Sequence, residues 1–439
     1  MDLQKSEIKL STKLGYMFYG LGGTSIHYFR SYYYMFFLTD VLYLNMQFAG
    51  MIVAIGTIWD AINDLLIGYL VSKHVFKNGE QLKPYSVFIL PLALNTVLMF
   101  SDFPVEQKLK GTIALILYLL YSVFFTFYTA AQNNVALVTK SEEERLSINT
   151  FTSFGTTLGS AIGALTCLPL LKWMGAMNKE GNLQDGSKFV WTAAIICGVS
   201  AAAAMVYFFT VKEKYHYSKE QAEELKFFDG VKFLIKERMW INNFLQLLML
   251  TLCTKLVNTN LTYYATYQLH RTDIVTSILA VNTICSVAVY AFIKPIKNKL
   301  GKSKTLYLSF AILVLGKIVF ALFPGSILSA YINVASIGVG TGLGQFVLFT
   351  NRNEIADVVQ AKHNVRVDGM VSTTITFGTK LAGAIAVYLS SALLEKVGYD
   401  GSLAAQSSEV LNMLNSLMGW IPLVFMVVII FATIDYKKA

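Results

Sequence analysis

Charge is scarce in this sequence of 439 residues: 14% of them are Asp, Glu, Lys or Arg, and 55% are apolar. Soluble domains of ordinary composition carry about 25% charged residues. The charged residues that are present cluster in short segments between long apolar runs. The composition therefore argues against a soluble domain and predicts an all-α, polytopic membrane protein in direct contact with the lipid bilayer.

Residues that usually build catalytic or metal sites are also few. The sequence has four cysteines, all inside apolar stretches and without metal-type spacing, and five scattered histidines. The apolar stretches contain no nucleophile elbow and no clustered His and Glu residues. We therefore expect no catalytic residue, no disulfide and no cofactor, and a membrane-embedded enzyme is disfavoured.

A basic patch is missing as well. The formal net charge is +9, but the lysines are spread over loops without interleaved aromatic residues. This pattern is not typical of nucleic-acid binding, so no nucleic-acid partner is expected. The first twelve residues, Met1 to Thr12, are polar and of mixed charge, so we expect no secretory signal peptide.

Apolar stretches long enough to cross a bilayer, which takes about 20 residues, occur twelve times. We expect spans near 14–39, 46–72, 84–101, 110–138, 147–173, 188–211, 240–267, 272–296, 303–323, 326–350, 369–395 and 410–434. These spans divide the chain into an N-terminal six-helix bundle (1–211), a charged central loop (212–239) and a C-terminal six-helix bundle (240–439). This is the layout of the major facilitator fold.

The positive charges indicate an orientation. Of the 36 Lys and Arg residues, 25 fall in segments that are cytoplasmic when the N-terminus lies inside, and 7 fall in the outer loops. Cytoplasmic loops are generally enriched in Lys and Arg. We therefore expect a multi-pass protein of the cell (plasma) membrane with both termini cytoplasmic. The second half of the central loop has an amphipathic pattern that predicts a helix along the inner surface, although a plain tether explains it as well.

Two acids lie inside an apolar stretch. Asp60 and Asp64 are one helical turn apart, with Asn63 beside them. A carboxylate in hydrocarbon is costly unless a cation, a polar partner or water compensates it. The spacing puts both acids on one helix face, where they repel each other unless a cation or proton lies between them. We therefore expect Asp60, Asp64 and Asn63 to bind a cation such as Na⁺; acids that line a wet cavity or bond a neighbouring helix are the alternative.

Four cations also fall within the predicted spans: Arg30, Lys255, Lys317 and Lys380. Intramembrane cations usually pair with acids or line a water-filled cavity. Lys380 lies in T-T-I-T-F-G-T-K-L-A-G-A, a small and polar setting suited to close helix packing. Facing the two aspartates, it would be an internal counter-ion that exchanges with a bound cation; the alternative is snorkelling to the surface. No matching acid is evident for Lys255 or Lys317.

Polar and aromatic residues lie in the N-terminal half. The fourth predicted span ends in the polar run Gln132, Asn133 and Asn134, whose side chains suit hydrogen bonds to a polyol or to neighbouring helices. Tyr28 and Tyr128 lie near the same depth. Sugars stack on aromatic rings, but tyrosine is also enriched at membrane interfaces. Both interpretations of these residues stay open.

The segment W-D-A-I-N-D-L-L-I-G (59–68) resembles the helix-two signature of the glycoside–pentoside–hexuronide:cation symporters, whose melibiose branch is the best understood. Lys380 follows Arg366 by fourteen residues, which is the family's spacing for its helix-eleven lysine. Further likenesses occur in family order at K-L-G-Y (13–16), T-D-V (39–41), K-N-G-E-Q-L-K-P-Y (77–85), E-E-R (143–145), E-I-A-D (354–357) and R-V-D-G (366–369).

This resemblance implies a secondary active transporter that couples uptake of a sugar, glycoside or hexuronide to a cation by alternating access. It also implies that Asp60 and Asp64 hold Na⁺, H⁺ or Li⁺, with Thr376 and Lys380 nearby. Two aspartates alone do not distinguish sodium from proton coupling, and we expect no cofactor besides the coupling cation.

The likeness ends at the sugar contacts. The melibiose branch holds sugar hydroxyls with a helix-one carboxylate, a helix-four carboxylate and a helix-five arginine, and here the matching positions are Thr24, Ala131 and Ser153. The side chain of Ala131 cannot form a hydrogen bond, which implies that the galactoside site is lost. Arg30, together with His27, suits an anionic substrate such as a uronide, because a guanidinium binds a carboxylate through two hydrogen bonds.

Two alternatives to a sugar symporter stay open. The same scaffold could transport a non-sugar, such as a lipid-like or peptide-derived solute. A nontransporting sensor would need an appended domain, and only about five residues follow the last predicted span. We expect a monomer, and the sequence does not specify the substrate or the direction of transport. The residues expected to contact the substrate are Thr24, Tyr28, Arg30, Tyr128, Gln132, Asn133 and Lys380.

Overall fold

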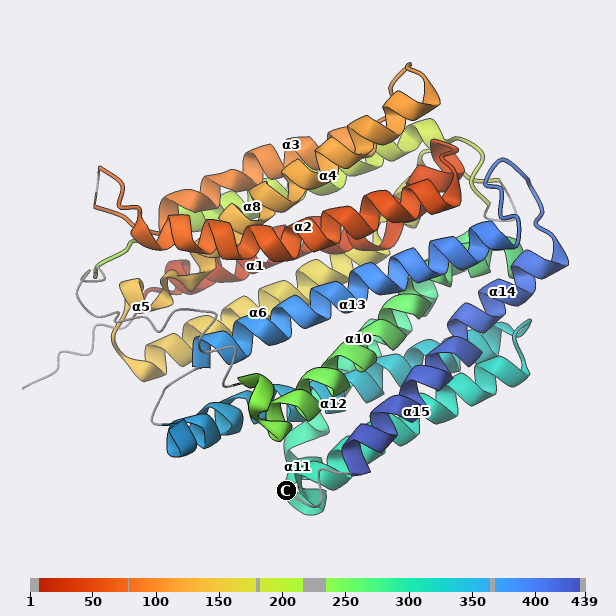
Figure 1. The fold of residues 1–439 in the computed structure, drawn as a ribbon. Helices are drawn as coiled ribbons and strands as arrows, with labels where there is room; N and C mark the ends of the chain where they lie inside the picture. The colour runs from red at the N-terminus through yellow and green to blue at the C-terminus, as the bar shows by residue number, and fades with distance from the viewer. Residues whose placement is uncertain (1–7, 78, 179–181, 216–233, 364–367, 435–439) are drawn as a thin grey trace, which may run out of the picture. The chain divides into compact units, whose positions relative to one another are not determined.

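The computed structural model describes residues 8–77, 79–178, 182–215, 234–363 and 368–434, and all regular elements in these ranges are helices (Figure 1). The chain divides into two compact units. Unit 1 comprises Met1–Leu44, Ile62–Asn178 and Leu183–Gln221, and unit 2 comprises Asn45–Ala61, Lys179–Asn182 and Ala222–Ala439. The central-loop segment 216–233, which holds most of the predicted surface helix, and Arg366 lie outside the described residues.

Unit 1 is a helical bundle in which α3, α4 and α8 run side by side (Figure 1). Helix α1 packs against α6 and α8. Its helices are α1 (Leu10–Phe36), the second half of α2 (Met46–Lys73), α3 (Ile89–Met99), α4 (Gln107–Ala130), α5 (Val135–Val138), α6 (Glu142–Leu165), α7 (Cys167–Trp173) and α8 (Phe189–Thr210). The turn η3 (Ala131–Asn134) separates α4 from α5.

Glycine lets α1 and α6 approach each other closely. Gly155, Gly159 and Gly163 recur once per turn on α6, and a Cβ on any of them would lie between 1.9 and 2.2 Å from a main-chain carbonyl oxygen of α1. Only a residue without a side chain fits there. Small residues four apart are a common device for close helix packing in membranes.

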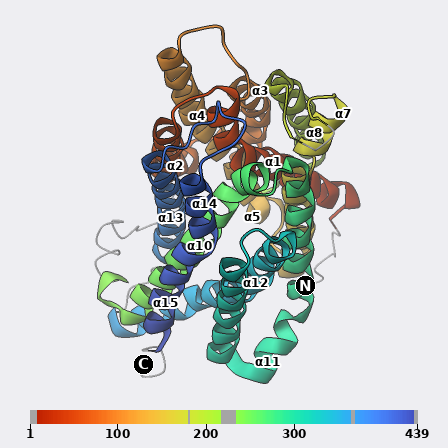
Figure 2. The same cartoon turned by 90° about the vertical axis from the view of Figure 1, so that its right-hand side faces the viewer.

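Unit 2 packs α10 against α13 and α15, and α11 against α12 (Figure 2). The element α11 consists of two helices that meet at a kink at Gly301, where φ is 77° and ψ is 168°, and Pro295 lies in the first of them. This break agrees with the two separate spans predicted at 272–296 and 303–323, and glycine is the residue best suited to positive φ. The helices of this unit are the first half of α2, α10 (Arg238–Tyr263), α11 (Val275–Leu322), α12 (Ile327–His363), α13 (Asp368–Lys396), α14 (Ser408–Met418) and α15 (Trp420–Ile434).

Helix α2 contributes to both units. Its residues up to Ala61 group with unit 2, and those from Ile62 onward group with unit 1. Asp60 and Asp64 are therefore on one continuous helix but have different surroundings.

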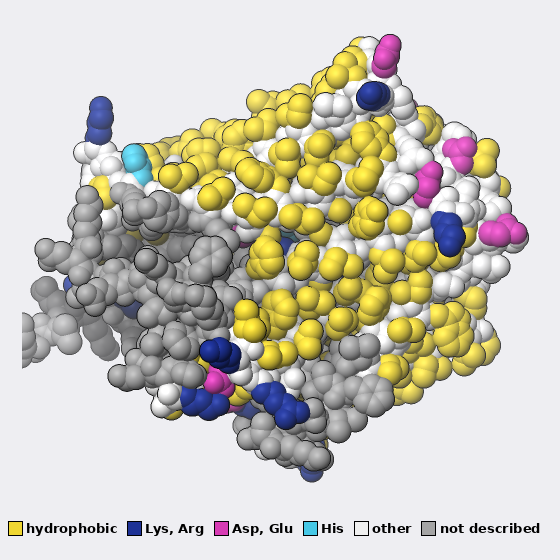
Figure 3. All heavy atoms as spheres, in the orientation of Figure 1, with side chains coloured by type: hydrophobic (Ala, Val, Ile, Leu, Met, Phe, Trp, Pro, Cys, Tyr) yellow, Lys and Arg dark blue, Asp and Glu magenta, His cyan; other side chains and the backbone are white. Residues whose placement is uncertain are grey.

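The helices have membrane-spanning character. Among the described residues, nine helices are long and apolar enough to cross a membrane, and the pair α6 and α7, bent by 43°, makes a tenth candidate. The bend precedes Pro169, which cannot donate a helical hydrogen bond. Over α2, α3 and α4, the face in Figure 3 is covered with apolar side chains, and charged side chains lie near helix ends. The prediction of an all-α, multi-span membrane protein is confirmed, and each of the twelve predicted spans overlaps a helix or helix pair.

Candidate functional site

The acidic turn of α2 runs from Asp60 to Asp64, and its first residue, Asp60, forms an ion pair within unit 2. Lys380 on α13 places its Nζ 2.6 Å from Asp60 Oδ2 and also donates a hydrogen bond of 3.3 Å to the main-chain oxygen of Asp60. The side chains of Lys380 and Asp60 are 23% and 18% exposed. Because both are largely withdrawn from solvent, their attraction is screened much less than that of a surface pair. Thr376, one turn earlier on α13, is exposed.

The second half of the acidic turn is held by α4 in unit 1. The hydroxyl of Thr126 donates a hydrogen bond of 2.8 Å to Asp64 Oδ1. The Asn63 amide donates to Thr126 Oγ1 at 2.9 Å and to the Ser122 carbonyl oxygen at 3.2 Å. Asn63 and Thr126 are buried, at 3% and 7% exposure. The Asp64 carboxylate, the Thr126 hydroxyl and the Ser122 carbonyl oxygen are hard ligands of the kind that small cations prefer.

Ser122 and Thr126 are functional candidates that the sequence analysis missed. They are one turn apart on α4, and together they contact the Asn63–Asp64 part of α2. Their i, i+4 spacing in an otherwise apolar span was the available signal. The partner helix could not be inferred from the sequence of α4 alone. The described residues contain no group of three or more His, Cys, Asp or Glu side chains able to share a metal ion.

A cationic and aromatic cluster joins α1 to α4 in unit 1. The Arg30 guanidinium lies 4.7 Å from the ring centre of Tyr118 and 4.6 Å from that of Tyr121, and it donates a hydrogen bond to the Tyr118 hydroxyl. His27 stacks on Phe125 with 4.9 Å between ring centres. The two tyrosine rings stabilise the charge and fix the plane of the guanidinium. This arrangement holds a positive charge within a membrane-spanning bundle.

Two of the predicted substrate residues bond main-chain groups. Tyr128 is 2% exposed, stacks on Tyr19 at 4.2 Å and donates a hydrogen bond of 2.5 Å to the Tyr19 carbonyl oxygen. The Thr24 hydroxyl donates to the carbonyl oxygens of Gly20 at 2.6 Å and of Thr156 at 3.1 Å. Both side chains therefore contribute to helix packing in the structure.

The remaining predicted substrate residues are more accessible. Tyr28 is 38% exposed, Gln132 is half-buried and Asn133 is exposed. Their neighbour Asn134 is fully buried, where it accepts a hydrogen bond from the Tyr16 hydroxyl and donates one of 2.9 Å to Glu213 Oε1. The polar run at the end of α4 thus has an anchored residue and two that are available for contacts.

Lys317 has a neutral partner. It is fully buried on α11, and its Nζ donates a hydrogen bond to Asn333 Oδ1 on α12. The Asn333 amide in turn donates to the Met418 carbonyl oxygen at 3.2 Å. Lys317 and Asn333 thus each have a hydrogen-bond partner, as buried polar groups require.

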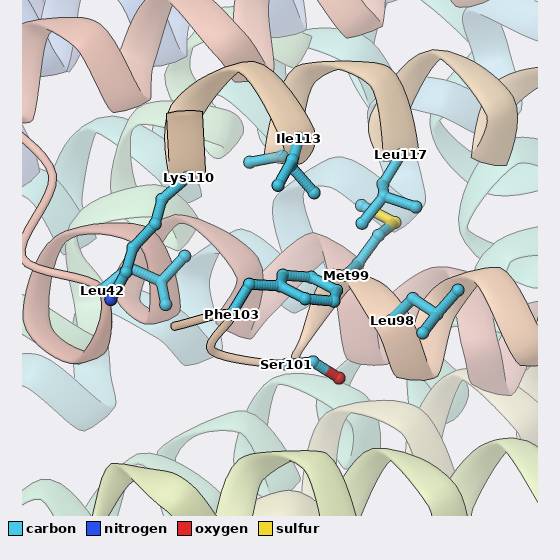
Figure 4. Close-up of a pocket in the computed structure, with 9 residues that line it drawn as sticks. Leu42, Leu98, Met99, Ser101, Phe103, Lys110, Ile113 and Leu117 are labelled. Carbon is cyan, nitrogen blue, oxygen red and sulfur yellow. The ribbon is translucent and has the colours of Figure 1, made fainter. Parts of the chain in front are cut away.

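A small cavity between α3 and α4 lies away from these residues. It measures about 10 Å³, and Ile113 and Leu117 point toward Phe103 and Met99 across it (Figure 4). A space of this size holds no more than a single water. It is therefore not a substrate site.

The sequence matches a family model described as MFS/sugar transport protein over residues 15–437. The chain belongs to this family of the major facilitator superfamily. It is therefore a membrane transporter and not an enzyme, as the sequence predicted.

Curated relatives span most of the chain. A sodium-dependent lysophosphatidylcholine symporter of Danio rerio is 22% identical, and the match covers 98% of this chain and 88% of the relative. An isoprimeverose transporter of Lactiplantibacillus pentosus is 24% identical, over 93% and 84%. A putative glycoside/cation symporter of Escherichia coli, YagG, is 23% identical, over 95% and 90%.

Solved structures share the fold. A bacterial homologue of the human lysosomal transporter Spinster, in an inward-facing and unoccupied conformation, has a TM-score of 0.72 at 12% identity, with 98% of each chain covered. The nucleoside transporter NupG has a TM-score of 0.67 at 14% identity, with 97% of this chain and 99% of that chain covered. These similarities support the major facilitator fold.

Proposed function

We propose that this protein is a secondary active symporter that uses a Na⁺ or H⁺ gradient to move a sugar, glycoside or hexuronide across the plasma membrane. The observation that carries the proposal is the acidic turn of α2, where Asp60 pairs with Lys380 and Asp64 accepts a hydrogen bond from Thr126. Intramembrane acids with such partners typically mark ion pathways. Curated relatives named as cation symporters and as a sugar transporter support the same conclusion.

The coupling cation binds, in this proposal, at the acidic turn. Asp60 and Asp64 supply negative charge, while Asn63 and Thr126 supply neutral oxygen ligands. Thr376 would add a further oxygen from α13. An incoming cation competes with the Lys380 ammonium for Asp60. Cation binding therefore weakens the attraction between Asp60 on α2 and Lys380 on α13. A proton would do the same by neutralising one carboxylate.

The transport cycle alternates access between two bundles, residues 1–211 and 240–439, joined by the central loop 212–239. Both termini are cytoplasmic and the protein acts as a monomer. These features rest on the positive-charge distribution and on the major facilitator fold.

Substrate contacts centre on Arg30 in unit 1. Its guanidinium, held against Tyr118 and Tyr121, suits a carboxylate such as that of a uronide. Tyr28, Gln132, Asn133 and Lys380 add polar contacts. We assign Thr24 and Tyr128 to the walls of the site because their hydroxyls bond main-chain oxygens.

A second candidate is transport of a lipid-like solute with an anionic group. The 22% identical lysophosphatidylcholine symporter, matched over 98% of this chain, favours it. The Arg30 cluster suits this candidate too, because arginine binds phosphate and carboxylate through the same planar pair of N–H groups.

An uptake panel tests the proposal. Cells expressing the protein are given radiolabelled neutral sugars, glycosides, hexuronides and a lysophospholipid, with and without Na⁺, at two pH values. We expect uptake of at least one sugar-type compound that depends on Na⁺ or on the pH gradient. Uptake of the lysophospholipid alone would establish the second candidate, and sugar uptake independent of both gradients would contradict symport.

Replacing Arg30 tests the preference for an anion. The Arg30→Gln variant should lose at least tenfold in apparent affinity for an acidic substrate, because a hydrogen bond to a charged group contributes about 1.5–3 kcal/mol. Competition uptake with matched acidic and neutral sugars measures it. An apparent affinity for the acidic substrate that is unchanged in Arg30→Gln, or transport of neutral glycosides only, would contradict the assignment of Arg30.

A further inference from the structure

An open cavity of about 510 Å³ lies on unit 1 beside the loop after α2 and the 3-10 turn η2 (Lys83–Phe88) that precedes α3. Two basic residues, His74 and Lys77, line it together with the apolar residues Val75, Phe76 and Pro84, and Phe208 at the end of α8. Cavities of about 300–1,000 Å³ are typical of small-molecule sites. Neither the cation site nor the Arg30 cluster uses any of these residues.

The cavity wall is fixed by hydrogen bonds. The Phe76 N–H donates to the Glu80 carbonyl oxygen at 2.9 Å, which closes the loop after α2. The Glu213 carboxylate accepts main-chain N–H groups of Gln81 at 2.6 Å and of Lys83 at 2.7 Å. These bonds hold residues 81–83 against Glu213, which follows the end of α8.

The charges at the cavity favour an anion. Glu80, the acid in the lining, pairs with Lys83 at 2.8 Å, and both side chains are largely buried. Lys83 also lies 5.0 Å from the centre of the Phe208 ring. The acid is thus compensated, while Lys77 and His74 are exposed at the opening. The positive charge of Lys77 attracts a negatively charged group, and the imidazole of His74 can donate a hydrogen bond to it.

An exposed apolar stripe leads away from the cavity. Leu66 and Leu70 are 53% and 58% exposed and lie one turn apart on one face of α2, and His74 directly follows the end of this helix. Phe209, at the end of α8, is 74% exposed. A soluble anion needs no such stripe, whereas the acyl chains of a lipid would cover it.

We propose that this cavity binds the headgroup of an anionic phospholipid, with the phosphate at Lys77 and His74 and the acyl chains along Leu66 and Leu70. The charge distribution puts this end of α2 on the cytoplasmic side, where basic pockets bind anionic headgroups. The site is separate from the transport machinery and does not depend on which substrate is carried.

Lipid selectivity tests this site directly. The full-length purified protein is placed in vesicles of phosphatidylcholine with 20% phosphatidylglycerol, and retained lipids are counted by native mass spectrometry. The wild type should retain phosphatidylglycerol with a preference of at least about fivefold, the effect expected for one Lys or Arg, here Lys77, near the surface. The His74→Gln/Lys77→Gln variant should lose this preference. The matched control Lys108→Gln, which removes an exposed lysine at the start of α4, should keep it.

Three outcomes would overturn the proposal. These are equal retention of the two lipids by the wild type, an unchanged preference in the double variant, and displacement of phosphatidylglycerol by an equal concentration of glycerol phosphate. The last would define a site for soluble anions. The exposed positions His74 and Lys77 should tolerate glutamine, and Lys77→Glu gives a second variant that should discriminate against phosphatidylglycerol still more strongly.

Discussion

Asp60 and Asp64 are the same residue type, one turn apart on one helix, yet the structure treats them differently. Asp60 belongs to unit 2 and forms an ion pair with Lys380 at 2.6 Å. Asp64 belongs to unit 1 and accepts a hydrogen bond of 2.8 Å from Thr126. A lysine supplies a full positive charge, whereas a hydroxyl supplies a dipole.

This difference suggests a division of labour within the acidic turn. In the proposed mechanism, a cation would displace Lys380 from Asp60, so the pairing of Asp60 would change when the cation binds. At Asp64 the cation would instead join the Thr126 hydroxyl, because Thr126 Oγ1 keeps a lone pair for coordination. Asp60 would therefore act as the switch and Asp64 as the anchor of the cation site.

The largest expected effect is on uphill transport. Asp60→Asn and Asp64→Asn should each abolish accumulation against a gradient, because both carboxylates are needed to balance the charge of the cation. Uptake into membrane vesicles with an imposed Na⁺ or H⁺ gradient measures this.

Asp185→Asn is the matched control, since Asp185 is an exposed loop acid bonded to Ser187. It should accumulate substrate normally. Normal accumulation by either α2 variant, at equal protein levels in the membrane, would remove the acidic turn from the mechanism.

A smaller effect is expected when only the hydroxyl that contacts Asp64 is removed, and it should appear in the apparent affinity for the coupling cation. Thr126→Val removes the hydroxyl that contacts Asp64 and Asn63. The apparent affinity for the coupling cation should fall by about 10- to 100-fold, since a hydrogen bond to a charged group contributes about 1.5–3 kcal/mol. The cation dependence of uptake measures it. Thr126→Ser keeps the hydroxyl and should behave like the wild type; equal losses in the two variants would point to a packing role for the Thr126 methyl group.

The smallest expected effect is on the free energy of unfolding, and it should differ between the Asp60 and Asp64 variants. Asp60→Asn leaves Lys380 without its carboxylate partner. Removing one partner of a fully buried ion pair lowers the free energy of unfolding by about 3–5 kcal/mol. About a fifth of each side chain is exposed here, so we expect about 1–2 kcal/mol. Asp64→Asn should be milder, because the amide oxygen still accepts from Thr126.

Thermal unfolding in detergent compares these variants. Asp60→Asn/Lys380→Gln should regain stability without regaining transport, because the uncompensated charge is gone but the cation site is not restored. Equal destabilisation by Asp60→Asn and Asp64→Asn would contradict the difference between the two surroundings.

The sequence was sufficient for the fold and for the family, because both depend on local patterns. Apolar runs of spanning length predicted the helices, and the segment around Asp60 and Asp64 predicted a symporter-type transporter. Local patterns were less informative about bends inside a predicted span. The break at Gly301 falls between two predicted spans, whereas the fifth predicted span bends ahead of Pro169, and the size of such a bend depends on backbone angles that composition does not specify.

Partners across helices were harder to predict than the helices themselves. Lys317 had no evident acid in the sequence, and the structure gives it the neutral side chain of Asn333. Ser122 and Thr126 were not predicted as site residues, because single hydroxyls are common in membrane helices, where they often form hydrogen bonds to their own main chain. Their role became visible only when α4 was placed beside Asn63 and Asp64.

Direct cation binding is the measurement that bears most closely on the acidic turn. Isothermal titration of the purified protein with Na⁺ and Li⁺, and potentiometric titration of bound protons, would be made on the wild type, Asp60→Asn and Asp64→Asn. The account predicts saturable binding of at least one of these cations by the wild type and its loss in both variants. Absence of binding in the wild type, or full binding retained by both variants, would contradict it.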